Sequence, residues 1–178
     1  HNSTKLMSIH PLFGPGANVF KPQKFILVPI KSSISEKKLF NSLFPNSKLV
    51  VCNANQHDKS MAYVISLVYF LNLSFILSLD KIPHLKDISG TSFTIQYLLA
   101  SGILHDSPEV ISSLQISNEQ FNEVLLNFTS NVNSIENLIA KNDNDQFIKI
   151  IKKVKKQIIS NQKSYEDLYQ LVNSIDSF

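Results

Sequence analysis

Hydrophobic and polar positions divide the chain into a first third with strand-like runs and a longer remainder with helical periodicity. Two short apolar runs bounded by turn residues, 24–30 and 48–52, are typical of buried strands. Between them, residues 35–44 repeat apolar side chains at helical spacing, and Ser35 is the expected N-cap. The order strand, helix, strand predicts the end of an α/β sheet.

After residue 53 the pattern becomes helical and stays so. We expect a first long helix from about residue 55 to 79 and a second over roughly 83–105. Ser107 and Pro108 predict the start of a third helix, because serine is a good N-cap and proline fits the first helical position. The spacing Ser117-Asn-Glu-Gln120 predicts a capping box before the next helix.

The most regular periodicity lies in two neighbouring segments whose apolar residues recur in steps of four and three. These residues are Phe121, Leu125, Phe128, Val132, Ile135 and Ile139, then Phe147, Ile151, Val154 and Ile158. The polar turn 142–145 separates the segments, so the sequence predicts two helices packed as an antiparallel hairpin. The lysines of the second segment lie mostly off the stripe and are expected on a solvated face.

Composition bounds the class of protein. With 178 residues, of which 43% are apolar, the chain can bury the core of one domain or a domain and a half. A net charge of +3 gives no reason to expect a nucleic-acid partner. The single cysteine, Cys52, excludes an internal disulfide framework, fits a reducing compartment, and is expected inside a buried strand. No secretory signal pattern is present, and we expect a cytoplasmic protein.

Residues 60–79 form an uncharged run of about 20 residues, long enough to cross a bilayer. Polar side chains recur through this run and would need hydrogen-bond partners in lipid: Ser60, Ser66, Asn72, Ser74 and Ser78. Neither flank carries a cluster of basic residues. A helix buried on all sides inside a helical domain or dimer has the same pattern. We therefore favour burial and expect no membrane contact, with a membrane-anchored protein as the alternative.

The first candidate for chemistry is His10, which follows the strand-like run 5–9 and opens the segment His10-Pro-Leu-Phe-Gly-Pro-Gly16. Proline fixes φ and glycine permits positive φ, so we expect His10 at a rigid strand end. An ordinary histidine pKa of about 6.5 leaves the imidazole largely neutral near pH 7 and able to act as a general base. From spacing alone, a structural turn whose histidine only caps a backbone group is the alternative.

A second candidate site is Gln56-His57-Asp58, at the start of the long helix. The positive end of the helix dipole disfavours imidazolium, so His57 is expected to be neutral and available as a polar ligand group. Asp58 suits the same dipole, and Asn55 is the candidate cap. A capped helix start with an incidental histidine is the alternative.

Three segments of the chain resemble prephenate dehydrogenases, in the order found in that family. His10-Pro-Leu-Phe-Gly-Pro15 resembles their H-P-M-F-G-P segment, and His57-Asp-Lys-Ser-Met-Ala62 resembles their H-D-x-x-M-A run. Residues 89–109 resemble the family's helix S-x-x-[FY]-R-L-x-L-x-x-x-G-R-[IL] and the D-P turn after it, with one inserted residue. The resemblance extends from about Ser8 to the helix that ends near Ile159.

The two arginines of the family helix are absent. Thr94 stands where the first is expected, Gly102 lies at or beside the second, and the chain contains no arginine at all. In the family these arginines bind substrate carboxylates, a role that suits a guanidinium fork. Three alternatives follow: threonine, serine or lysine side chains replace them, the substrate differs, or the site is degenerate.

The resemblance implies a mixed fold. Residues 1–54 would form the last strands of a Rossmann-like sheet, and residues 55–178 an all-α helical dimerisation domain. It also implies oxidative decarboxylation of prephenate to 4-hydroxyphenylpyruvate, or the matching reaction of arogenate, with hydride transfer to NAD or NADP. His10 would be catalytic, and four residues would bind substrate: His57, Thr91, Ser92 and Thr94. The expected partner is a second copy of the chain, and no metal is expected.

The glycine-rich turn that binds a dinucleotide is absent. The segment Gly14-Pro-Gly16 has no third glycine and no following helix of the right type. In the family this turn lies upstream of the His-Pro segment. The resemblance therefore implies that a domain absent from this chain binds most of NAD or NADP, with Pro11 and Gly14 nearby, and that the chain is inactive alone. A non-catalytic dimerisation or ligand-sensing relative is the alternative: the missing arginines favour it, and the two histidines count against it.

Overall fold

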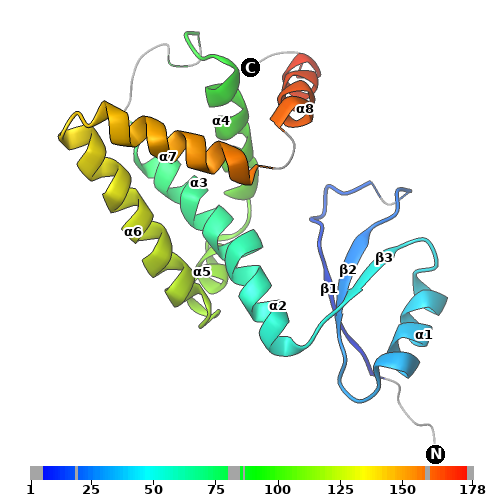
Figure 1. Ribbon diagram of the computed structural model, residues 1–178. Coiled ribbons are helices and arrows are strands. Elements are labelled where there is room, and N and C mark those ends of the chain that lie inside the picture. The colour runs from blue at the N-terminus through cyan, green and yellow to red at the C-terminus, as the bar shows by residue number, and fades with distance from the viewer. Residues whose placement is uncertain (1–5, 19, 80–84, 86, 159–160, 176–178) are drawn as a thin grey trace, which may run out of the picture. The chain divides into compact units, whose positions relative to one another are not determined.

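The computed structural model describes residues 6–18, 20–79, 85, 87–158 and 161–175 (Figure 1). Contacts within the chain divide it into two compact units, His1–Met61 and Ala62–Phe178. The first unit contains a three-stranded sheet, and the described residues of the second unit are helical or lie in turns and loops between helices. The predicted fold class, a short α/β segment followed by an all-helical region, is confirmed.

The sheet of the first unit has the order β1-β2-β3. Strand β1 (Ser8–Pro11) pairs antiparallel with β2 (Lys24–Val28), and β2 pairs in parallel with β3 (Lys48–Val51). Helix α1 (Ser33–Leu43) joins β2 to β3, as a crossover between parallel strands requires. The two predicted strands are thus confirmed.

Helix α1 and strand β2 supply the core of the first unit. Phe25 and Leu27 lie on the same face of β2, and both are buried. The ring of Phe25 contacts Phe40 of α1 with a centroid distance of 5.2 Å, and Phe44 at 4.9 Å. Ile26 is buried on the opposite face of β2. Because β2 is the central strand, burial on both faces explains its unbroken apolar sequence.

Helix α1 begins earlier than predicted, because Ser32 and not Ser35 is the N-cap. Ser32 has extended backbone angles, and its side chain accepts a hydrogen bond from the Ser35 N–H at 3.4 Å. The buried Glu36 carboxylate accepts bonds from the backbone N–H groups of Ile30, Lys31 and Ser32 at 2.8–3.1 Å. These bonds lower the pKa of Glu36, and they fix the loop that leads into the helix.

The long helix is continuous from Ala54 to Leu77, close to its predicted extent. It consists of α2 (Ala54–Met61), a π-helical segment η1 (Ala62–Leu67) and α3 (Val68–Leu77). Its cap is Asn53, and the prediction of Asn55 is wrong. Asn53 accepts from the Gln56 N–H at 2.9 Å, and the Gln56 side chain accepts from the Asn53 N–H at 3.1 Å. This reciprocal pair is a capping box.

A single chain does not bury this helix on all sides. By length and composition the helix could cross a membrane: its most apolar window has a mean hydropathy of 1.9, and 22% of that window is buried. Large apolar side chains remain exposed on it, among them Tyr63, Val64 and Leu77. The residues of this helix that are buried within the second unit are small or polar, namely Ala62, Ser66 and Asn72. The apolar face therefore needs a cover that one chain does not provide.

The buried polar groups of this helix find partners inside the second unit. The Ser66 hydroxyl donates to the Leu114 carbonyl at 2.7 Å. The Asn72 side chain donates to the Val68 carbonyl at 2.7 Å and accepts from the Gln96 amide at 2.9 Å. Such bonds are needed because an unpaired buried polar group is costly in a protein interior as well as in lipid.

Five more helices complete the second unit as described: α4 (Thr91–Ile103), α5 (Pro108–Ile116), α6 (Phe121–Ala140), α7 (Asn144–Gln157) and α8 (Asn161–Asn173). The predicted helix over 83–105 is only partly correct, because α4 begins after the extended Gly90; residues 83, 84 and 86 lie outside the described residues. The Ser107 cap of α5 is confirmed. The predicted capping box before α6 is wrong, since Asn118 accepts the Gln120 N–H instead.

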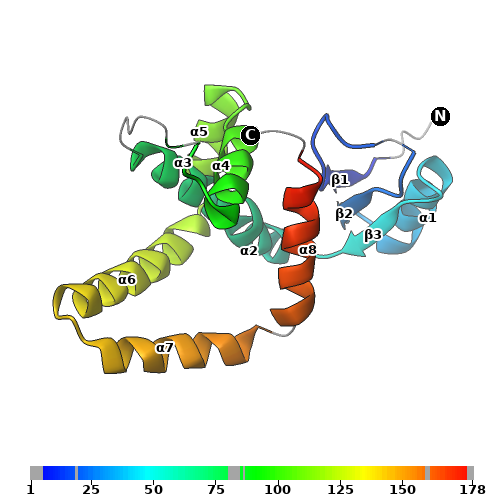
Figure 2. The same cartoon turned by 90° about the horizontal axis from the view of Figure 1, so that it is seen from above.

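Helices α6 and α7 form as predicted but do not pack along their length. At the turn, Asn142 adopts a positive φ of 52° and Asp143 caps α7. Figures 1 and 2 both show the two helices meeting at this turn and then diverging. The start of the α6 stripe is packed, where Phe121 and Phe128 contact Phe70, and Phe147 at the start of the α7 stripe is partly buried. Six other residues of the two stripes are 40–60% exposed: Val132, Ile135, Ile139, Ile151, Val154 and Ile158.

One further helix was not predicted, and the predicted place of the cysteine is wrong. Helix α8 follows the last predicted helix and packs against α4. Cys52 lies just after β3 and is partly exposed, so its expected place inside a buried strand is wrong.

Replacing Phe40 with alanine should destabilise the first unit by about 3–5 kcal/mol, because a fully buried ring leaves a cavity. The matched control Leu43→Ala, at an exposed position of the same helix, should change stability by no more than about 0.5 kcal/mol. Urea unfolding followed through the amide NMR signals of β2 measures both. Equal losses in the two variants would contradict the assignment of Phe40 to the core.

Candidate active site

The two histidines singled out in the sequence lie side by side in the first unit. Nδ1 of His10 and Nε2 of His57 are 2.8 Å apart, within hydrogen-bond distance. The ring centroids are 5.1 Å apart with an interplanar angle of 57°. Strand β1 carries one histidine, and the first turns of α2 carry the other. Residues separated by 47 positions are thus brought into direct contact.

Strand pairing holds His10 in place. His10 is opposite the buried Ile26 of β2 in the antiparallel register, so its side chain lies on the Ile26 face of the sheet, away from Phe40. One residue later the strand ends at Pro11, and the Leu12 N–H donates to the Lys24 carbonyl at 2.9 Å. No described glycine has a positive φ, so the rigidity expected of this segment comes from the strand ladder.

The capping box at Asn53 positions His57. It fixes the first turn of α2, and α2 contacts β2. His57 therefore lies in the first turns of a helix in which the capping box already provides hydrogen-bond partners for N–H groups at the N-terminus.

Asp58 extends the histidine pair to a chain of three side chains. Its Oδ1 is 2.8 Å from Nδ1 of His57, so both ring nitrogens of His57 have partners. The side chain of His57 is 20% exposed and that of Asp58 is 56% exposed. From the sequence we assigned Asp58 only to the helix dipole, and this contact was missed. The adjacent His-Asp dipeptide was the one signal that could have suggested it.

Burial lowers the pKa of His10 below its ordinary value, and the charge of His57 lowers it further. His10 is therefore neutral at pH 7 and retains one bare ring nitrogen. A neutral imidazole in a fixed orientation can accept a proton or a hydrogen bond from a ligand hydroxyl.

The other predicted site residues, Thr91, Ser92 and Thr94, lie in the first turns of α4, in the second unit. Thr94 is buried, and its hydroxyl is 3.3 Å from that of Ser89. Thr91 is partly buried and Ser92 is exposed. Hydrogen bonds from Tyr165 and then from Thr91 lower the pKa of Tyr169, so helix α8 reaches the start of α4.

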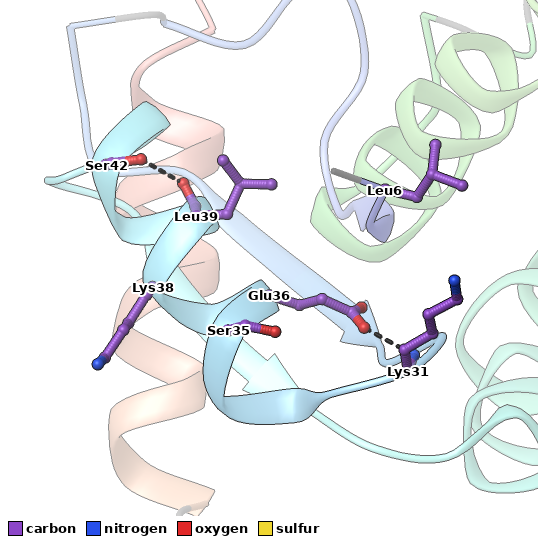
Figure 3. Close-up of a pocket in the computed structure, with 7 residues that line it drawn as sticks. All are labelled: Leu6, Lys31, Ser35, Glu36, Lys38, Leu39 and Ser42. Atoms are coloured by element: carbon purple, nitrogen blue, oxygen red, sulfur yellow. Dashed lines mark hydrogen bonds between the residues drawn. The ribbon is translucent and has the colours of Figure 1, made fainter. Parts of the chain in front are cut away.

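A hollow of about 530 Å³ also opens in the first unit beside α1 (Figure 3). Its lining includes Lys31, Ser35, Glu36 and Lys38. Figure 3 shows the Glu36 carboxylate turned toward the Lys31 backbone, and the Lys38 amine pointing away from it. The carboxylate is already occupied by backbone N–H groups and is unsuited to acid–base chemistry. Among the residues that the structure describes, no group of three or more His, Cys, Asp or Glu side chains could hold a metal ion.

Comparison with known proteins identifies the family. The family model described as "Prephenate dehydrogenase, dimerization domain" matches residues 53–153, more than half of the chain. The chain belongs to the prephenate dehydrogenase dimerization-domain family. The match begins at the Asn53 capping box and ends inside α7, so it includes the His57-Asp58 pair.

One relative of this chain is a probable arogenate/prephenate dehydrogenase of Methanocaldococcus jannaschii. It is 24% identical over 162 residues, which cover 86% of this chain and 36% of the relative. The crystal structure of Synechocystis arogenate dehydrogenase is similar with a TM-score of 0.65 and 15% identity, covering 85% of this chain and 59% of that one. Prephenate dehydrogenase from Aquifex aeolicus, in complex with hydroxyphenyl propionate and NAD+, is similar with a TM-score of 0.65 and 20% identity, covering 85% and 57%. The chain thus spans between a third and three fifths of these proteins.

The titration of His10 tests the site directly. We expect its NMR titration midpoint below 6.5, and a partial rise toward 6.5 in a His57→Gln variant, which removes the charge of the second imidazole. Because the folded state has the lower pKa, the contribution of His10 to stability should fall as the pH falls from about 6.5 through that midpoint. The control variant His105→Gln should leave the titration of His10 unchanged. A midpoint at or above 6.5 in the wild type would contradict this account.

Proposed function

We propose that the chain is the substrate-binding and dimerising part of a prephenate or arogenate dehydrogenase. Residues 1–54 would be the last strands of its nucleotide-binding domain, and residues 55–178 its helical domain. The observation that carries the proposal is the hydrogen bond between His10 and His57 in a chain of this family. Both histidines occupy the family motifs, and a fixed neutral imidazole is the group that the reaction needs.

His10 is proposed to act on the ring hydroxyl of prephenate. Its bare nitrogen accepts a hydrogen bond from the hydroxyl at C4 and raises the electron density on that oxygen. The oxygen can then stabilise the positive charge that develops at C4 as hydride leaves. The bond between C1 and the carboxylate breaks, carbon dioxide leaves, and the bonding electrons complete the aromatic ring of 4-hydroxyphenylpyruvate. General-base assistance of this kind contributes about 10²–10⁴ in rate.

NAD or NADP would supply the hydride acceptor. The described residues offer no glycine-rich turn for a pyrophosphate, and a Cβ added at Gly14 or Gly16 would meet no atom within 4 Å. By resemblance, Pro11 and Gly14 would lie near the cofactor, and a domain absent from this chain would hold most of it. The chain should therefore show no activity alone.

The substrate carboxylates are proposed to be held without arginine. By resemblance, Thr91, Ser92 and Thr94 occupy the helix that binds substrate in the family, and His57 supplies a further polar contact. Thr91 and Ser92 lie in the first turn of α4, where the helix dipole favours anions. The absence of arginine also supports a second candidate function, a non-catalytic ligand-sensing or dimerisation module.

We propose that the partner is a second copy of this chain. The exposed stripes of α6 and α7 and the exposed apolar face of the long helix are the surfaces that a dimer would cover. A dimer that covers these surfaces would account for an uncharged helix without a membrane. The proposal includes a cytoplasmic location and, from the small net charge, no nucleic-acid partner.

The decisive activity test uses the chain together with whatever is encoded upstream of His1. Reduction of NAD and NADP is followed with prephenate and with arogenate, and a His10→Asn variant should lose about 10²–10⁴ in kcat. The exposed His105→Asn variant is the control and should keep full activity. A folded, nucleotide-bound protein that binds prephenate without turning it over would favour the non-catalytic module.

The dimer is tested by sedimentation velocity at micromolar concentration. We expect a dimer for the wild type and a shift to monomer for Ile151→Asp, which puts a charge into the exposed stripe of α7. The control Lys152→Asp, a neighbouring exposed residue off the stripe, should remain dimeric. A stable wild-type monomer would contradict the proposal.

A further inference from the structure

We propose that Asp58 is a positioning residue that acts through His57 to fix which nitrogen of His10 carries the proton. In this arrangement Nδ1 of His10 is protonated and Nε2 is left bare to accept the hydrogen bond of a substrate hydroxyl. The role of the bare nitrogen rests on the proposed function, whereas the proton positions follow from the contacts between the three side chains together with an ionised carboxylate and two neutral imidazoles.

The first step is the contact between Asp58 and His57. Oδ1 of Asp58 is 2.8 Å from Nδ1 of His57, and the Asp58 side chain is 56% exposed to water. An exposed carboxyl group is ionised near pH 7, and an ionised carboxylate can only accept hydrogen bonds. The proton between these two groups therefore belongs to Nδ1 of His57.

The second step is the contact between the two histidines. A neutral imidazole carries one N–H, and in His57 this N–H is used at Nδ1. Nε2 of His57 is consequently an acceptor, and it lies 2.8 Å from Nδ1 of His10. Since one of the two nitrogens must donate, His10 donates from Nδ1.

The third step concerns the remaining nitrogen. His10 is held neutral by burial, so it carries no second proton. With its one proton at Nδ1, its Nε2 has a free lone pair. This is the state in which His10 can act as a base.

The contact between the histidines alone would not select this state. If His57 donated from Nε2 and His10 accepted at Nδ1, the distance of 2.8 Å would be satisfied equally well. His10 would then carry its proton at Nε2 and could not accept a substrate hydrogen bond there. Asp58 removes this second arrangement by requiring the proton of His57 at Nδ1. The aspartate of a Ser-His-Asp triad orients its histidine in the same manner.

The proton positions can be measured on this chain without substrate or cofactor. Protonated and bare imidazole nitrogens differ widely in ¹⁵N chemical shift, so two-bond ¹H–¹⁵N correlation spectra at pH 7.5 identify the tautomer of each ring. We expect the Nδ1–H tautomer for both His10 and His57. An Nε2–H tautomer at His10 in the wild type would overturn the proposal.

Variants separate the carboxylate from other effects. Asp58→Ala should move His10 toward the Nε2–H tautomer, while Asp145→Ala, which removes an exposed carboxylate from the first turn of α7, should not. Asp58→Glu should preserve the wild-type tautomers, because it keeps a carboxylate acceptor. Unchanged His10 tautomers in a folded Asp58→Ala protein would also overturn the proposal.

Kinetics test the consequence for catalysis, again with the chain and whatever is encoded upstream of His1. Asp58→Ala should lower kcat about 10–100-fold, by analogy with the loss seen when a hydrogen-bond partner that orients a metal-binding histidine is removed, and should leave KM near its wild-type value. A rise in KM with unchanged kcat would overturn the positioning role. A wild-type protein without dehydrogenase activity would refute the proposed function, while the tautomer measurement would still decide the position of the protons.

Discussion

The hydrogen bond between His10 and His57 ties the end of a strand to the beginning of a helix, and each side of it depends on a separate backbone device. Pairing of β1 with β2 aligns His10 with Ile26, and the capping box at Asn53 sets the first turn of α2. Neither device involves the imidazoles themselves. The geometry of the pair is therefore fixed by the backbone without a ligand, which is the preorganisation that the proposed acid–base role requires.

The second unit has a different constraint, since it has more apolar surface than one chain can cover. Its packed centre is small and gathers Ala62, Phe121 and Val124 with partly buried neighbours. The stripes of α6 and α7 diverge instead of packing on each other, so their apolar residues stay exposed. A helical unit of this composition is typical of a protein that completes its core by association.

Local signals in the sequence identified the strands, most helices and both histidines, because each depends on periodicity or on a nearby turn. The capping residues were harder to predict. The caps are Ser32 and Asn53, not the predicted Ser35 and Asn55. Hydrogen bonds to Glu36 and Gln56 fix these caps, and the periodicity of the sequence does not show such bonds. The contact between His10 and His57, which are 47 residues apart, depends on the pairing of β1 with β2 and on the contact of α2 with β2, and spacing alone could not specify these. The apolar stripes of α6 and α7 predicted that the two helices pack on each other. Periodicity identifies an apolar stripe but does not specify which surface covers it.

The hydrogen bond between Asn72 and Gln96 has a consequence for how α3 and α4 assemble. Two largely apolar helices can slide along each other with little penalty, since one row of aliphatic side chains resembles the next. A slip of one helical turn, about 5.4 Å, would separate these amides and leave the side-chain oxygen of the buried Asn72 unpaired, at a cost of about 1–3 kcal/mol. The amide pair thus specifies one register of the two helices, whereas apolar contacts alone would allow several.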